Sequence, residues 1–393
     1  MTGGYIGRIL VSDLTKGQLW EEELDEQLYY QFIGGPGLGV RLLYQRQPAM
    51  VDSLGDQNIL AFMPGLLSGT GAPSSSRLTV VSKSPLTGGW GEANVGGSMA
   101  RELKRAGYDG ILFQGVSSSP VYLLIYDGKA ELKDASNLWS KDTIETVEWL
   151  RREIGDKTLS VGSIGPAGES LSLISSIIFD KGRAAGRSGM GAVMGSKRLK
   201  AVAVKGKYKA HVADSGHFRE LRKSILVRIK ESPRAKMWSA EGLAGTTEAL
   251  IVQGATPIKN WTLSGQEAIP FHEKIGGRSV NKYLVENSQG GASCADCPIA
   301  CGATLKLEDE NVLRKFHRPE YETIAGFGAM CFNDDVIPII KANDICNRYG
   351  IDTISTSSSI AFAIGCYERG VSLNRIQVVL NWVGIMHRLS WPY

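Results

Sequence analysis

The sequence has little excess of either charge. Its 393 residues carry 44 Lys and Arg against 40 Asp and Glu, which gives a formal net charge of +4. No block of like charge concentrates this excess, whereas a nucleic-acid groove or an anionic membrane surface attracts clustered positive charge. We therefore expect small molecules or proteins as partners, and neither nucleic acid nor membrane.

Long apolar runs and a basic leader are also missing. A helix that spans a bilayer needs about 18 or more apolar residues, and no stretch of the sequence reaches that length. The N-terminus lacks a basic segment followed by an apolar core and a cleavage site. These absences predict a cytoplasmic protein.

Glycine, in contrast, is abundant and clustered. The chain has 47 glycines, well above the usual share of about 7%. Hydrophobic residues make up 43% and charged residues 21%, a globular composition that excludes disordered, collagen-like and coiled-coil proteins. Dense glycine indicates backbone that approaches something closely.

The pattern of the chain changes near residue 207. Before it, short β-like runs alternate with Gly, Pro and Ser turns, and two segments have helical spacing, Ser98–Ala106 and Lys141–Ile154. After it, helical periodicity dominates, in His217–Ser232, Ile337–Tyr349 and Thr353–Arg369. The prediction is an α+β fold, with a mostly β domain at 1–207 and a mostly helical domain at 208–393.

The strongest chemical motif is the Cys-x2-Cys-x3-Cys run of Cys294, Cys297 and Cys301. Such short spacings let successive thiolates turn towards one metal ion or one cluster. Three states are open: a zinc site, an iron–sulfur cluster and unligated thiols. The proline in the loop and the final Cys-Gly resemble ferredoxin-type ligation, which favours iron–sulfur.

Two glycine-rich segments have the chemistry of anion-binding loops. Residues 180–197 combine many backbone N–H groups with Arg183, Arg187 and Lys181, which suits a phosphate or another polyanion, although the P-loop spacing is absent. Residues 72–97 place Arg77 and Asn94 among turns, where both side chains can hydrogen-bond a polar heterocycle. The alternative in each case is an ordinary glycine-rich turn.

Two polar groups lie further along the chain. Glu320 and Glu322 are two residues apart, and such pairs are mostly solvated, but a carboxylate beside a metal cofactor is a natural proton acceptor. Asp352 follows the apparent end of a helix at Gly350 and is placed to cap the next helix. Capping alone would explain Asp352.

Together these segments resemble the tungsten-containing aldehyde ferredoxin oxidoreductase family. The resemblance extends in order to about Gly370, through GRILVSDLTKG, AGYDGI, SIGPAGE, RAAGRSGMGAVMGSKRLKA, CADCPIAC, PEYET and GIDTIST. In that family, two molybdopterins bridged through their phosphates by Mg2+ hold the metal, and a [4Fe-4S] cluster lies beside one pterin. The resemblance implies oxidation of an aldehyde to a carboxylic acid, with electrons passing to ferredoxin or another iron–sulfur carrier.

The resemblance also implies roles for single residues. Cys294, Cys297 and Cys301 would be three cluster ligands, and Glu322 would be the catalytic carboxylate near tungsten or molybdenum. The backbone carbonyls of Asn94 and Ala184 would face Mg2+. The residues implied to hold pterin and phosphate are Arg77, Asn94, Gly96, Gly97, Arg183, Ala184, Gly186, Arg187, Gly189, Asn347 and Asp352.

Departures from the family pattern keep other functions open. Asn347 stands where the pterin motif has Asp, and Lys341 stands where some relatives have a glutamate that holds a bridging iron between two subunits.

Family members continue beyond residue 393, where the fourth cluster cysteine and a second pterin motif lie, so we expect this chain to hold an incomplete site. The alternatives are a related tungsten reductase of an aromatic thioester in a larger assembly, an inactive fragment and a zinc-binding module. A homodimer and separate electron-transfer subunits are both compatible with the sequence.

Overall fold

The computed structural model describes residues 3–180, 182–285, 293–309 and 312–370. Lys181 of the glycine-rich segment and residues 371–393, the end of the predicted helical domain, lie outside this part of the chain. Two compact units are present: the first is Met1–Lys230, Cys294–Pro298 and Asn347–Asp352, and the second is Glu231–Ser293, Ile299–Cys346 and Thr353–Tyr393. The fold class is α+β, as predicted, while the boundary at 207/208 stays a prediction.

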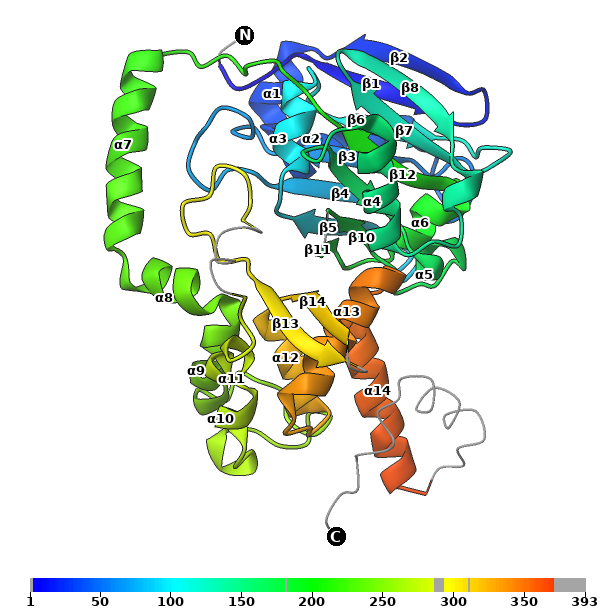
Figure 1. Cartoon of the computed structure of the whole chain (residues 1–393). Helices are drawn as coiled ribbons and strands as arrows, with labels where there is room; N and C mark the ends of the chain where they lie inside the picture. Colours follow the sequence, from blue (N-terminus) through cyan, green and yellow to red (C-terminus); the bar gives the residue numbers. More distant parts are fainter. Residues whose placement is uncertain (1–2, 181, 286–292, 310–311, 371–393) are drawn as a thin grey trace. The chain divides into compact units, whose positions relative to one another are not determined.

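The first unit contains two six-stranded sheets among the described residues (Figure 1). Their strand orders are β2-β1-β6-β3-β4-β5 and β11-β10-β9-β12-β7-β8. The strands of the first sheet are β1 Arg8–Asp13, β2 Gln18–Glu23, β3 Leu60–Pro64, β4 Leu78–Lys83, β5 Trp90–Val95 and β6 Ile111–Gln114. The strands of the second are β7 Val121–Tyr126, β8 Lys129–Asp134, β9 Ser160–Ser163, β10 Ile177–Phe179, β11 Arg183–Ala185 and β12 Leu199–Val204.

Alternation of side chains along the strands builds three apolar layers. Leu10 and Leu123 belong to a core shared by both sheets, whereas their neighbours Ile9 and Tyr122 belong to separate cores on the outer faces. The shared core includes Phe62 of the first sheet and Phe179 of the second, whose ring centroids are 5.9 Å apart. The two sheets therefore face each other.

Helices cover the outer faces of both sheets. Helices α1 and α2 contribute to the core outside the first sheet, and α4 contributes to the core outside the second. Helix α4 begins with a capping box formed by Asp142 and Glu145 and ends at Gly155 in the left-handed region. The helices of this unit are α1 Glu26–Phe32, α2 Gly35–Arg46, α3 Met99–Arg105, α4 Thr143–Ile154, α5 Pro166–Glu169, α6 Met190–Ser196 and α7 Ser215–Glu231, with a 3-10 turn at Ser136–Leu138.

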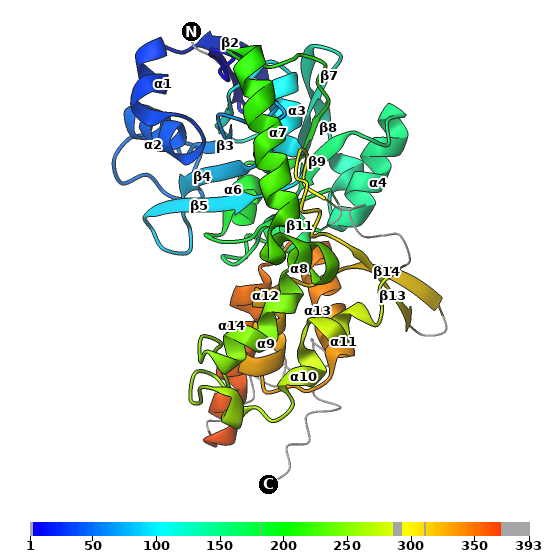
Figure 2. The ribbon, with the colours of Figure 1, turned by 90° about the vertical axis from the view of Figure 1, so that its left-hand side faces the viewer.

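The second unit is mainly helical, as predicted, and it also contains a β-hairpin that the sequence did not predict. Figure 2 shows this hairpin extending from the helices around it. Its strands are β13 Thr304–Asp309 and β14 Val312–His317. The helices are α8 Pro233–Glu241, α9 Thr247–Val252, α10 His272–Ile275, α11 Gly277–Asn281, α12 Tyr321–Ile324, α13 Val336–Tyr349 and α14 Thr353–Glu368, with 3-10 turns at Leu243–Thr246 and Gln266–Ala268 and a π-helix at Ala325–Met330. Among the helices that the structure describes, none combines the length and apolar character that a membrane crossing requires.

Candidate functional site

The candidate site of the first unit begins at the edge strand β5. Asn94 pairs with Thr79 of β4, and its side-chain amide donates a hydrogen bond to the Thr79 hydroxyl at 3.1 Å. Arg77 directly precedes β4 and is exposed. Because β4 and β5 are antiparallel, the start of one and the end of the other lie together. The pairing therefore brings Arg77 beside Gly96 and Gly97.

Gly96 lies against Cys294, the first cysteine of the motif. A Cβ atom built on Gly96 would lie 2.5 Å from Cys294 Sγ and 3.8 Å from an Arg77 guanidinium nitrogen. Only glycine fits at this distance. The Cys297 N–H donates to the Cys294 carbonyl at 3.2 Å, so both thiols belong to one tight turn. The structure thus brings Arg77, Gly96, Cys294 and Cys297 together.

The hairpin of β10 and β11 meets the same loop. Figure 1 shows β5 and β11 as neighbours, and a Cβ on Gly97, whose φ is +113°, would lie 3.8 Å from Arg183 Cγ. Arg183 pairs with Phe179, and Ala184 is exposed on the same short strand. Two loops that are far apart in the sequence therefore come together at one end of the unit.

Residues 347–352 return to the first unit beside the glycine-rich loop that follows β11. The Asp352 carboxylate lies 3.8 Å from the Arg187 guanidinium and 3.1 Å from where a Cβ on Gly186 would lie. The Asp352 N–H donates to the Ile174 carbonyl at 3.0 Å, and the Asn347 carbonyl accepts a 2.8 Å hydrogen bond from the Thr143 hydroxyl. Asn347 and Asp352 are both buried. These contacts hold both ends of the segment within the first unit.

Gly189 ends the glycine-rich loop between β11 and α6, where the backbone takes a left-handed conformation. Its φ is +69°, and it precedes α6 at the cap position. A Cβ there would lie 2.5 Å from the Leu173 carbonyl oxygen. The glycine permits a tight entry into the short helix.

Two predicted site residues belong to the second unit. Glu322 lies on α12 with an exposed side chain, between two anchored neighbours: the Tyr321 hydroxyl lies 3.1 Å from that of Thr256, and the Thr323 hydroxyl lies 2.9 Å from that of Thr353. Cys301 accepts a hydrogen bond at its carbonyl from Arg318. Within the described residues, no three His, Cys, Asp or Glu side chains gather closely enough to hold a metal ion. The assignment of Cys294, Cys297 and Cys301 as cluster ligands stays a prediction.

Sequence reasoning missed the serines that hold the cysteine turn. The Ser76 hydroxyl and the Ala295 N–H both donate to the Gly97 carbonyl, at 2.9 and 3.0 Å. Ser74 donates from its N–H to the Asp296 carbonyl at 2.9 Å, and its hydroxyl lies 3.5 Å from Cys297 Sγ. The run of three serines before Arg77 was a visible signal, but only its arginine stood out as a ligand group.

The chain is an α+β protein in which two facing sheets present glycine-rich edge loops beside a cysteine turn. Two family models match the chain. Residues 9–206 match the N-terminal domain of aldehyde ferredoxin oxidoreductase, and residues 220–382 match domains 2 and 3 of the same enzyme. The chain belongs to the aldehyde ferredoxin oxidoreductase family.

Individual relatives agree with this assignment. The tungsten-containing aldehyde ferredoxin oxidoreductases of Pyrococcus abyssi and Thermococcus kodakarensis are 38% and 40% identical, over 94% and 93% of this chain. The WOR-like subunit of an aliphatic sulfonate oxidoreductase from Pyrococcus furiosus is 30% identical over 96% of the chain. The chain spans 59% of the length of the first two relatives and 62% of the third.

A solved structure has the same fold. The active-site complex BamBC of benzoyl-coenzyme A reductase, solved with 1,5-dienoyl-CoA, superposes with a TM-score of 0.80 and 29% identity. The match covers 95% of this chain and 57% of the other.

Proposed function

We propose that this chain supplies the pterin-binding part of an oxidoreductase that oxidises aldehydes to carboxylic acids. The observation that carries the proposal is the close contact of Gly96 with Cys294 and Arg77, beside the contact of Gly97 with Arg183. The two glycines let a thiol and two arginines lie close to the backbone of one loop; thiolates ligate iron–sulfur clusters, and arginines bind phosphate. The residues present therefore fit a phosphate-bearing cofactor with an iron–sulfur cluster beside it.

Each loop has a definite role in this proposal. Arg77, Arg183 and Arg187 would bind the phosphates of a tungsten or molybdenum bis-molybdopterin, and the carbonyls of Asn94 and Ala184 would face the bridging Mg2+. Asn347 and Asp352 would hydrogen-bond a pterin ring. The thiolates of Cys294, Cys297 and Cys301 would hold three corners of a [4Fe-4S] cluster.

The bound cofactor would supply the two-electron oxidation, with ferredoxin or a similar carrier receiving the electrons. Glu322 would accept the proton released when water oxygen is added to the carbonyl carbon. Its exposed carboxylate is free to meet a substrate, and its backbone is held on both sides through Tyr321 and Thr323.

A second candidate function is reduction of an aromatic thioester. The similarity to the benzoyl-coenzyme A reductase complex supports it, because that match covers 95% of this chain. Assays of the purified protein with an aldehyde series and a viologen dye, and with an aroyl thioester and a strong reductant, separate the two reactions. Turnover of the thioester alone would assign the chain to the second function.

The role of Glu322 is tested by Glu322→Gln, with Glu320→Gln as the matched control. Loss of a general base lowers the rate by about 10²–10⁴-fold, so we expect that drop in kcat for aldehyde oxidation at unchanged tungsten content. Glu320→Gln should retain most activity. Equal rates for Glu322→Gln and the unsubstituted protein would move the proton acceptor elsewhere.

A further inference from the structure

One carboxylate connects the two glycine loops of the first unit. Asp180 lies in the tight turn between β10 and β11, three residues before Arg183, and its φ is +53°. Among non-glycine residues, Asp and Asn adopt this left-handed conformation most readily, so an aspartate suits this turn. Sequence reasoning gave Asp180 no role.

The carboxylate of Asp180 is held from two sides. Its Oδ2 accepts a hydrogen bond from the Ser98 hydroxyl at 2.9 Å, and its Oδ1 accepts one from the Arg151 guanidinium at 2.7 Å. Its own N–H donates to the Val161 carbonyl at 2.7 Å. Ser98 follows Gly97 directly, so the Ser98 contact joins the β5 loop to the β10–β11 turn.

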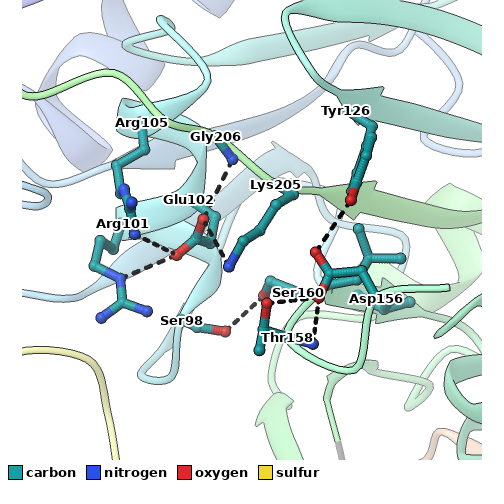
Figure 3. A network of polar contacts seen from close by, with 12 residues as sticks. Ser98, Arg101, Glu102, Arg105, Tyr126, Asp156, Thr158, Ser160, Lys205 and Gly206 are labelled. Atoms are coloured by element: carbon teal, nitrogen blue, oxygen red, sulfur yellow. Dashed lines mark hydrogen bonds and ion pairs between the residues drawn. The ribbon is translucent and has the colours of Figure 1, made fainter. Parts of the chain in front are cut away.

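The same position faces the predicted cofactor loops. A Cβ on Gly97 would lie 3.9 Å from Asp180 Oδ2 and 3.8 Å from Arg183 Cγ. Ser98 also lies 2.8 Å from the hydroxyl of Ser160 on β9 (Figure 3). Burial raises the pKa of Asp180, whereas Arg151 and Ser98 oppose that rise. The carboxylate therefore lies at the junction of β5, β9, β10 and β11.

We infer that Asp180 is a positioning residue that holds the Asn94–Gly97 loop and the Arg183–Ala185 strand in the mutual arrangement that binds the cofactor phosphates. The inference rests on the proposed function for the identity of the ligand. The contact between the two loops does not depend on which ligand binds. Without the Asp180 carboxylate, Ser98 and Arg151 lose their shared acceptor, and the two loops are free to separate.

Three variants test this role. Asp180→Asn keeps the size and one acceptor oxygen but removes the charge, and Ser98→Ala removes the donor from the other loop. Ser98→Thr keeps the hydroxyl and should restore the behaviour of the unsubstituted protein. Asp156→Asn is the matched control, because Asp156 accepts hydrogen bonds from Thr158 and Tyr126 in the same region (Figure 3) and has, among the described residues, no hydrogen bond to either glycine loop.

Hydrogen exchange of the purified protein is the first measurement. In Asp180→Asn and Ser98→Ala, amides of residues 94–98 and 183–187 should exchange together about 10-fold faster or more, the scale of one lost charged hydrogen bond. Ser98→Thr and Asp156→Asn should leave both segments unchanged. Unchanged exchange in Asp180→Asn and Ser98→Ala, or a change in only one segment, would overturn the inference.

Pterin content, measured by fluorescence after acid oxidation, is the second measurement. We expect about a 10-fold loss in Asp180→Asn and Ser98→Ala, and full content in Ser98→Thr. Full pterin content in Asp180→Asn and Ser98→Ala would contradict the positioning role of Asp180. If the unsubstituted protein carries no pterin, the proposed function fails, and the exchange data still decide whether Asp180 joins the loops.

Discussion

At the scale of single residues, Lys197 is a charged group inside an apolar core. Its side chain is fully buried, and its ammonium donates to the Gly115 carbonyl at 3.2 Å. Burial lowers its pKa from 10.5 to about 8, and Asp56 opposes the fall. Between these two pH values the unfolded chain binds more protons than the folded chain, so this lysine makes stability rise with pH.

The substitution Lys197→Met tests this coupling. The variant should be more stable than the unsubstituted protein near pH 7, and its advantage should shrink by about 3 kcal/mol between pH 8 and 10.5. Urea unfolding across that range measures the difference. Lys207→Met is the control, because Asp127 raises the pKa of this exposed lysine above 10.5 and its effect on stability changes only above that pH; the variant should keep the pH slope of the unsubstituted protein across the measured range. Parallel curves for the unsubstituted protein and Lys197→Met would contradict the account.

At the scale of elements, the contact between the β5 loop and the cysteine turn is tight enough to test by adding one carbon. A Cβ at Gly96 meets Cys294 Sγ at 2.5 Å, whereas a Cβ at Gly89 meets nothing closer than 4.0 Å. Gly96→Ala should therefore lower the unfolding free energy by about 1–3 kcal/mol, as overpacking does. It should also displace Cys294 and speed its alkylation.

Gly89→Ala is the control for this prediction. It lies just before β5 and should leave both stability and the alkylation of Cys294 unchanged. Peptide mass spectrometry after timed alkylation measures the reactivity of each cysteine. If Gly96→Ala behaves like Gly89→Ala, the close contact is not a constraint.

Elements with a strong periodic pattern were predictable from the sequence, and those without one were not. Strand β3 is a continuous apolar run, β12 is apolar apart from Lys200, and α4 combines helical spacing with an acidic cap. Helix α2 was missed because Gly35, Gly37 and Gly39 lower its helix propensity. Strands β5 and β11 lie among glycines that indicate turns, so the local sequence does not predict them.

At the scale of the whole molecule, the sequence predicted residues for the candidate site but did not predict which residues lie beside them. Arg77, Gly96 and Arg183 were predicted from the family resemblance, because the motifs that contain them match those of the family in residue type and in order. The contact of Ser98 with Asp180 joins residues 82 apart in the chain, and no local pattern encodes such a pairing.

We propose that the first unit holds a tungsten or molybdenum pterin. The most direct test of this proposal is the content of tungsten, molybdenum, iron, zinc and pterin in the protein purified, with any accompanying subunits, from cells supplied with tungstate. We expect tungsten or molybdenum with pterin in a constant ratio, together with iron, and loss of pterin in Arg77→Ala but not in Arg152→Ala on the exposed face of α4. Zinc as the sole metal, or a protein without pterin, would contradict the account.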